Sequence, residues 1–96
     1  MMCKGSHQAV KPEHDFARRC YRKGFRATEA RLRVVRRAFE LNDGFSADDL
    51  VEVFANEEPR VSRATIYRTL SLLVSVGMLS QDPGTFVFRF NASELG

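Results

Sequence analysis

The sequence predicts a mainly helical domain that ends in a short β-hairpin. Four stretches place apolar residues at helical spacing, and three of them begin at a serine or threonine, which are preferred N-cap residues. After Gly77 the apolar period shortens from about 3.6 residues to about 2, as in a strand. With 96 residues, of which 44% are hydrophobic, the chain is long enough for one domain with a small core.

Residues 1–12 are polar and contain Gly5 and Pro12, and we expect them to be disordered. The first helix is predicted over 13–23, with Phe16 and Cys20 one turn apart on its buried face. Gly24 then ends the helix. The domain is expected to span 13–91 and to be followed by a tail at 92–96.

A second helix is predicted over 28–41. Thr28 is its N-cap, and Glu29 lies in the first turn, where the helix dipole favours an acid. Its buried stripe is expected to consist of Leu32, Val35 and Phe39, widened by Val34, Ala38 and Leu41. Arginines cover the rest of the helix, and residues 42–44 have the chemistry of a turn.

The third helix is predicted to begin after Ser46, with Asp49 completing a weaker version of the capping box. It ends before a connection at 56–60. The residues expected on its buried side are Leu50, Val53 and Phe54. Its outer side is acidic, so we do not expect this helix to contact a polyanion.

The fourth helix is predicted between the N-cap Ser62 and the terminator Gly77. Its core side comprises Thr65, Ile66, Thr69, Leu70, Leu73 and Val76. The five residues of its other side form the outer face: Ala64, Tyr67, Arg68, Ser71 and Ser75. This face allows close approach, carries long donors and has no acid, which are the properties that a helix in the DNA major groove needs.

A β-hairpin follows, with strands predicted at 78–81 and 85–90 and a turn at 82–84. Three phenylalanines, expected to lie on the helices, share one face of the second strand: Phe86, Phe88 and Phe90. Arg89 is the hairpin's one basic residue, so we expect the hairpin to contribute little to binding a polyanion. Helices followed by a hairpin form the winged helix-turn-helix order, in which the hairpin is called the wing and the fourth helix is the recognition helix.

Charge is segregated along the chain, although the net charge is only +3. Residues 18–37 contain nine basic residues and one acid, and residues 40–58 contain seven acids and no base. Twelve of the fifteen basic residues are arginine, which suits bidentate phosphate and guanine contacts better than lysine does. This distribution favours a nucleic-acid partner; the alternative is a solvated helix surface with charges segregated by chance.

Three motifs identify a family resemblance. They are Arg26-x-Thr28-x-x-Arg31 followed by Val34 and Val35; Ser46-Ala47-Asp48-Asp49-Leu50; and Pro59-x-Val61-Ser62-x-Ala64-Thr65-Ile66-Tyr67-Arg68-Thr69-Leu70-x-x-Leu73 ending in Gly77-Met78-Leu79. On these motifs, residues 25–91 resemble the N-terminal DNA-binding domain of the ferric uptake regulator family of bacterial metalloregulators.

The resemblance implies that Tyr67 and Arg68 contact double-stranded DNA from the major-groove helix, with Ala64 close to the bases. It implies a homodimer that represses transcription from AT-rich palindromes when loaded with iron, zinc, manganese or a related signal. The family's dimerisation and metal-binding half would begin where this sequence stops, so no cofactor is expected in this chain. Either a DNA-binding fragment or a short protein that has lost sensing fits this pattern.

Two sensing positions of the family differ in this chain. The resemblance places a histidine shortly before the serine of the third helix, where this chain has Gly44 and Phe45. It places a glutamate after the aromatic residue of the second wing strand, where Arg89 follows Phe88. Neither position is expected to bind a metal.

The candidate DNA-contacting residues are Arg26, Arg31, Arg63, Ala64, Tyr67, Arg68 and Ser71. The first three are expected to contact phosphates. Tyr67 and Arg68 are expected to contact bases or the groove wall, with Tyr67 suited to a thymine methyl group. The alternatives are that Tyr67 packs on the wing and that the arginines are solvated.

Other classes of function have weaker support in the sequence. Cys3, His7, His14 and Cys20 match no zinc spacing, and no nucleophile motif or paired-carboxylate pocket suggests an enzyme. The chain has no membrane-spanning run and no secretory signal, so we expect a cytoplasmic protein. The alternative function is a winged-helix protein–protein module that uses the acidic third helix.

Overall fold

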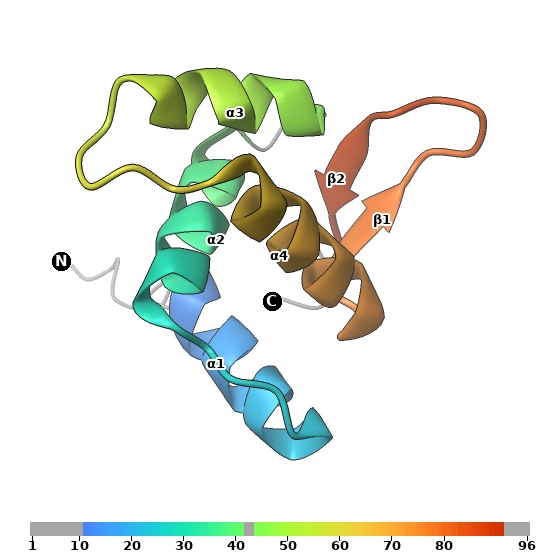
Figure 1. Cartoon of the computed structure of the whole chain (residues 1–96). Coiled ribbons are helices and arrows are strands. Elements are labelled where there is room, and N and C mark those ends of the chain that lie inside the picture. Colours follow the sequence, from blue (N-terminus) through green and yellow to red (C-terminus); the bar gives the residue numbers. More distant parts are fainter. Residues whose placement is uncertain (1–10, 42–43, 92–96) are drawn as a thin grey trace, which may run out of the picture.

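The computed structural model describes residues 11–41 and 44–91. In this part of the chain, four helices precede a two-stranded antiparallel hairpin, as the sequence predicted (Figure 1). The elements are α1 (Pro12–Lys23), α2 (Glu29–Leu41), α3 (Ala47–Ala55), α4 (Arg63–Ser75), β1 (Leu79–Gln81) and β2 (Phe88–Phe90). Disorder was predicted for residues 1–12, of which 1–10 lie outside the described residues. The predicted tail at 92–96 also lies outside them.

Helix α1 begins at Pro12, one residue before the predicted start. Proline suits the first helical position, because the N–H that it lacks would have no partner there. The helix ends at Gly24, whose φ of 81° places it in the left-handed region. Phe16 and Cys20 are fully buried, as predicted.

Serine caps set the beginnings of α3 and α4. Asp49 N donates to Ser46 Oγ at 3.2 Å, and Ser46 N donates to the Asp49 carboxylate at 2.9 Å, so the predicted capping box is complete. Thr65 N donates to Ser62 Oγ at 3.1 Å, which confirms the predicted cap of α4.

Helix α4 ends in a Schellman motif at Gly77. Gly77 has a φ of 84°, its N–H donates to Val74 O at 3.1 Å, and Met78 N donates to Leu73 O at 3.0 Å. The chain therefore turns sharply and enters β1, which packs against α4. This turn is the reason that the hairpin lies beside α4 (Figure 1).

The core forms where α4 meets α2, α3 and β1, and α1 closes it by packing on α2. Ile66, Leu70 and Leu73 of α4 are at most 1% exposed. Thr69 is also fully buried, and its hydroxyl donates to Thr65 O at 2.7 Å, so this polar group is satisfied. In the described part of the chain, no helix is both long and apolar enough to cross a membrane.

The buried stripe of α2 differs from the prediction. Val34, Val35 and Ala38 are fully buried, whereas Leu32 and Phe39 are only partly buried. The reason is that α2 packs against α1, α3 and α4, so its most enclosed side lies between these neighbours. In α3, Leu50 and Phe54 are buried as predicted, but Ala47 joins them while Val53 is only partly buried.

The second strand of the wing is shorter than predicted. Pairing runs only from Leu79 opposite Phe90 to Gln81 opposite Phe88, and residues 82–87 form the turn. Phe86 lies in that turn and is 81% exposed, so the expectation that it packs on the helices is wrong. The alternation of phenylalanines begins at Phe86, but β1 ends at Gln81, which pairs with Phe88, so the residues before Phe88 have no partner in β1.

Phe45 ties the wing to the segment before α3. Phe45 N donates to Phe88 O at 3.1 Å and Phe88 N donates to Phe45 O at 2.7 Å, which makes an antiparallel bridge. Their rings stack with centroids 5.9 Å apart, and Phe90 packs edge-on against Phe39 of α2 at 5.2 Å. The wing is thus anchored at its base by contacts among four aromatic side chains and by one bridge.

Several arginines of α2 are neutralised within the fold. Arg33 lies 3.2 Å from Glu57 Oε1, and Arg37 pairs with the same carboxylate. Arg36 donates to Glu13 of α1 at 2.9 Å. Burial raises the pKa of Glu13 and is the largest single effect, but the hydrogen bond from Arg36, a backbone hydrogen bond and the charges of Arg36 and Lys11 together outweigh it and lower the pKa overall. The basic cluster at 18–37 is therefore less available to a partner than its sequence suggests.

We predict that Phe45 and Phe86 differ sharply in their contribution to stability. Phe45→Ala should lower the free energy of unfolding by about 3 kcal/mol or more, because it leaves a cavity under the wing. Phe86→Ala should change it by less than about 0.5 kcal/mol, because the ring is outside the core. Urea unfolding followed by circular dichroism measures both; equal losses would contradict the placement of the two rings.

Candidate nucleic-acid interface

The predicted outer face of α4 is exposed along its whole length. Ala64, Arg68, Ser71 and Ser75 are exposed, and Tyr67 is 44% exposed. The opposite side of the helix is buried, as described above. The sequence prediction of which α4 residues face outward is therefore confirmed, while their contact with DNA stays a prediction.

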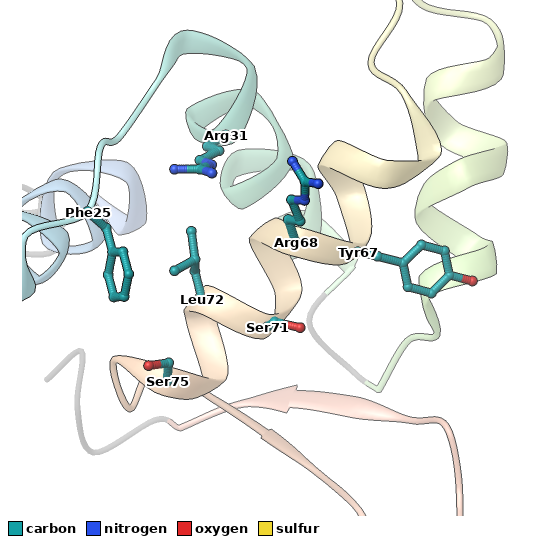
Figure 2. Close-up of a pocket in the computed structure, with 7 residues that line it drawn as sticks. All are labelled: Phe25, Arg31, Tyr67, Arg68, Ser71, Leu72 and Ser75. Atoms are coloured by element: carbon teal, nitrogen blue, oxygen red, sulfur yellow. The ribbon is translucent and has the colours of Figure 1, made fainter.

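A hollow lies between α4 and the segment that leads into α2. Phe25 and Arg31 form one wall, and Arg68, Ser71 and Ser75 of α4 form the other (Figure 2). Tyr67 also lines the hollow, with its ring directed away from Phe25. Leu72 of α4 forms its apolar floor. Two guanidinium groups thus border one open, partly apolar surface, which suits a sugar–phosphate backbone better than a bare inorganic anion.

A second hollow lies on the other side of α4, between the start of α3 and the wing. Its walls include Asp48 of α3 and Gln81 and Phe86 of the wing. Tyr67 and Ser71 line this hollow as well as the first. They therefore form the ridge between the two hollows.

Arg68 is free to bind a partner. In residues 11–41 and 44–91, its guanidinium makes no hydrogen bond or ion pair. Figure 2 shows it projecting from the middle of α4 toward the side of the hollow where Arg31 lies. A solvated arginine without an acid beside it keeps all five donors for phosphate or guanine.

Arg31 is held in place by the backbone of the preceding segment. Its Nη1 donates to Arg26 O at 2.7 Å, and its backbone N–H donates to Thr28 Oγ1 at 3.3 Å, which confirms the predicted cap of α2. Arg26 itself is exposed beside it. The structure thus brings these two candidate phosphate contacts together at the edge of the first hollow.

Arg63 has a weak partner that sequence reasoning missed. Its Nη1 lies 3.9 Å from Asp48 Oδ1, and both side chains are largely exposed. Exposed pairs of this kind contribute little energy, so Arg63 can exchange this carboxylate for a phosphate at small cost. The proximity of the starts of α3 and α4 follows from the helix-turn-helix packing rather than from any local sequence signal.

Sequence reasoning also missed Phe25 and Phe86 as border residues of the two hollows. Phe25 is 42% exposed and directly follows the helix terminator Gly24, outside any periodic segment. Phe86 belongs to a period-2 pattern that suggested burial. No sequence signal separates them from buried phenylalanines, since Phe45 also follows a glycine and is buried.

The two sensing positions of the family contain a phenyl ring and a guanidinium. Phe45 is buried against Phe88, and Arg89 folds back so that a Cβ at Gly44 would lie 3.2 Å from its Nη1. Arg89 Nε is 3.3 Å from Asp82. Neither group ligates metals, so the residues at these positions do not fit a metal site.

The N-terminal set of cysteines and histidines is only partly described. Cys3 and His7 lie outside the described residues. On α1, His14 is exposed and Cys20 is fully buried; burial raises the pKa of the Cys20 thiol, and the charge of Arg31 offsets part of that rise. Among the described residues, no three His, Cys, Asp or Glu side chains are grouped to hold a metal ion.

The chain was compared with known proteins. A model of the ferric uptake regulator family matches residues 22–94, which covers all elements from the end of α1 to the wing. No curated protein matches the chain. The matched range includes every candidate DNA-contacting residue.

We predict that Cys20 is chemically protected in the folded protein. In a Cys3→Ser variant, which leaves one thiol, Cys20 should resist Ellman's reagent at pH 8 because it is buried and its raised pKa leaves little thiolate. The reaction should become fast in urea, with glutathione as the accessible reference thiol. Fast reaction of the folded variant would show that Cys20 is available as a ligand.

Proposed function

The chain belongs to the ferric uptake regulator family, and we propose that it binds double-stranded DNA sequence-selectively in transcription regulation. In this proposal α4 lies in the major groove. The observation that carries it is the outer face of α4: it is exposed and free of acids, and in the described structure its guanidinium is unpaired. The proposal requires no metal or other cofactor on this face.

The side chains of the outer face suit the major groove by size. The groove is about 12 Å wide and admits one helix. Ala64 and Ser71 are short, so the backbone can come close to the base edges. Tyr67 and Arg68 are long enough to reach them, the tyrosine ring for a thymine methyl group and the guanidinium for guanine or phosphate.

Three arginines around α4 provide phosphate contacts. Arg26 and Arg31 contact the strand beside the first hollow, and Arg63 contacts phosphate at the start of α4. Together with Arg68, about four neutralised phosphates predict a slope near −3.6 for the logarithm of the binding constant against that of salt concentration. Contacts of this kind position the protein and carry no sequence information.

The partner is proposed to be an AT-rich inverted repeat that binds two copies of the chain in a repressor arrangement. Family membership supports DNA binding and dimerisation in general. One module with few contacts binds weakly alone, and two half-sites bound together raise the affinity through effective concentration. The protein–protein alternative rests only on the exposed carboxylates of α3, whereas DNA binding is supported by the family as well as by the outer face of α4.

We predict that Arg68→Ala abolishes preference for the inverted repeat. Fluorescence anisotropy over a salt series should show the wild-type chain binding the repeat about tenfold or more tightly than the variant does, because the loss of one good side-chain contact costs about 1–3 kcal/mol. Binding to a scrambled duplex should change less. Arg36→Ala is the matched control, since Arg36 is a helical arginine already paired with Glu13.

Equal weak binding of wild type and Arg68→Ala to both duplexes would overturn the proposed function. The basic side chains would then form only an electrostatic surface, and a protein partner would be the better explanation. Loss of affinity in Arg36→Ala equal to that in Arg68→Ala would likewise contradict a specific role for α4.

We also predict that Tyr67 detects a thymine methyl group. Replacing single thymines of the repeat by deoxyuridine should weaken wild-type binding about threefold to tenfold at one position per half-site, and Tyr67→Phe should behave like wild type. Tyr67→Ala should bind the thymine and uracil duplexes equally. A uracil effect that persists in Tyr67→Ala would assign the methyl contact to another residue.

A further inference from the structure

We infer that Phe86 at the tip of the wing contacts the minor groove of the DNA beside the recognition helix and strengthens binding by an apolar, salt-independent contact. The inference rests on the proposed function and assigns to the wing a role that its lack of free basic residues had seemed to exclude. Phe86 is 81% exposed and borders the second hollow.

The position of Phe86 connects it with the outer face of α4. Phe86 lines the second hollow together with Tyr67 and Ser71, the two residues that also form the ridge of the outer face. Figure 1 shows the wing projecting from the body of the protein next to α4. When α4 lies in the major groove, the adjacent part of the duplex surface faces the wing.

The charges of the wing leave no cation for a phosphate. Arg89 is the one basic residue of the hairpin, and it lies 3.3 Å from Asp82 and folds back over Gly44. The wing tip is thus close to neutral, so it can approach DNA without strong repulsion and must contribute by its apolar ring.

The surroundings of Phe86 favour DNA over a protein partner. In the second hollow, Leu70 is buried and Phe88 is half-buried, so its exposed aromatic rings are those of Phe86 and Tyr67 rather than a broad apolar patch. A stable protein interface buries about 800 Å² on each partner, which one ring does not supply. A minor groove about 6 Å wide accepts a single flat ring, and phenylalanine is among the residues that insert there.

The test compares Phe86→Ala with Tyr21→Ala on the AT-rich inverted repeat. Tyr21 is 85% exposed on α1 and lines neither hollow, so it is a matched exposed aromatic control. Phe86→Ala should bind the repeat about tenfold more weakly than wild type. Its salt slope should be unchanged, because a phenyl ring releases no counterions. Tyr21→Ala should bind like wild type, and Phe86→Leu should retain most of the affinity.

Hydroxyl radicals attack the sugars of DNA from the minor groove, so footprinting with these radicals locates the contact of Phe86. The wild-type chain should protect a short minor-groove segment flanking each half-site, and Phe86→Ala should lose that protection alone while keeping the protection due to α4. Thermal unfolding should be the same for both chains, which separates loss of contact from loss of folding.

Unchanged affinity and footprint in Phe86→Ala would overturn the inference and leave the proposed function standing. If wild type itself does not prefer the repeat, the proposed function fails and this inference with it. If sedimentation shows self-association that Phe86→Ala abolishes while DNA binding is unaltered, the ring belongs to a protein contact and the inference is wrong.

Discussion

Helix α4 packs against α2, α3 and β1 at the same time, and this burial determines which of its sides faces solvent. Ile66, Leu70 and Leu73 are buried in one row. Because successive helical residues are rotated by about 100°, enclosing that row directs Tyr67 and Arg68 outward. The candidate interface is therefore a consequence of the core. A change that rotates α4 in the core also rotates its outer face.

The fold was predictable from the sequence where local chemistry decides. Ser46 and Ser62 begin helices because their hydroxyls accept backbone N–H groups within three residues, and Gly77 ends α4 because it adopts a positive φ. These signals need no knowledge of distant neighbours. Together with the helix signals at Gly24 and Thr28 and the apolar periodicity, they were sufficient to place the described helices and the hairpin in order, and to identify the outer face of α4.

Features that depend on distant neighbours were not predictable. The alternating phenylalanines predicted a long second strand, but pairing stops where β1 ends at Gln81. The sequence shows no acidic partner for Arg33 and Arg36 of α2, because Glu57 and Glu13 lie more than 20 residues away and only folding places them beside these arginines. For the same reason the sequence indicated Arg31 and Arg68 separately, while only the packing of α2 beside α4 shows that they share one hollow.

The bridge between Phe45 and Phe88 has an entropic consequence for binding. It joins the wing to the segment that caps α3, and α3 packs on α4. The wing and the recognition helix are therefore held in one relative orientation before any partner arrives. Binding then costs little conformational entropy for aligning the wing with α4. A chain that makes few contacts therefore retains more of the energy of those contacts as affinity.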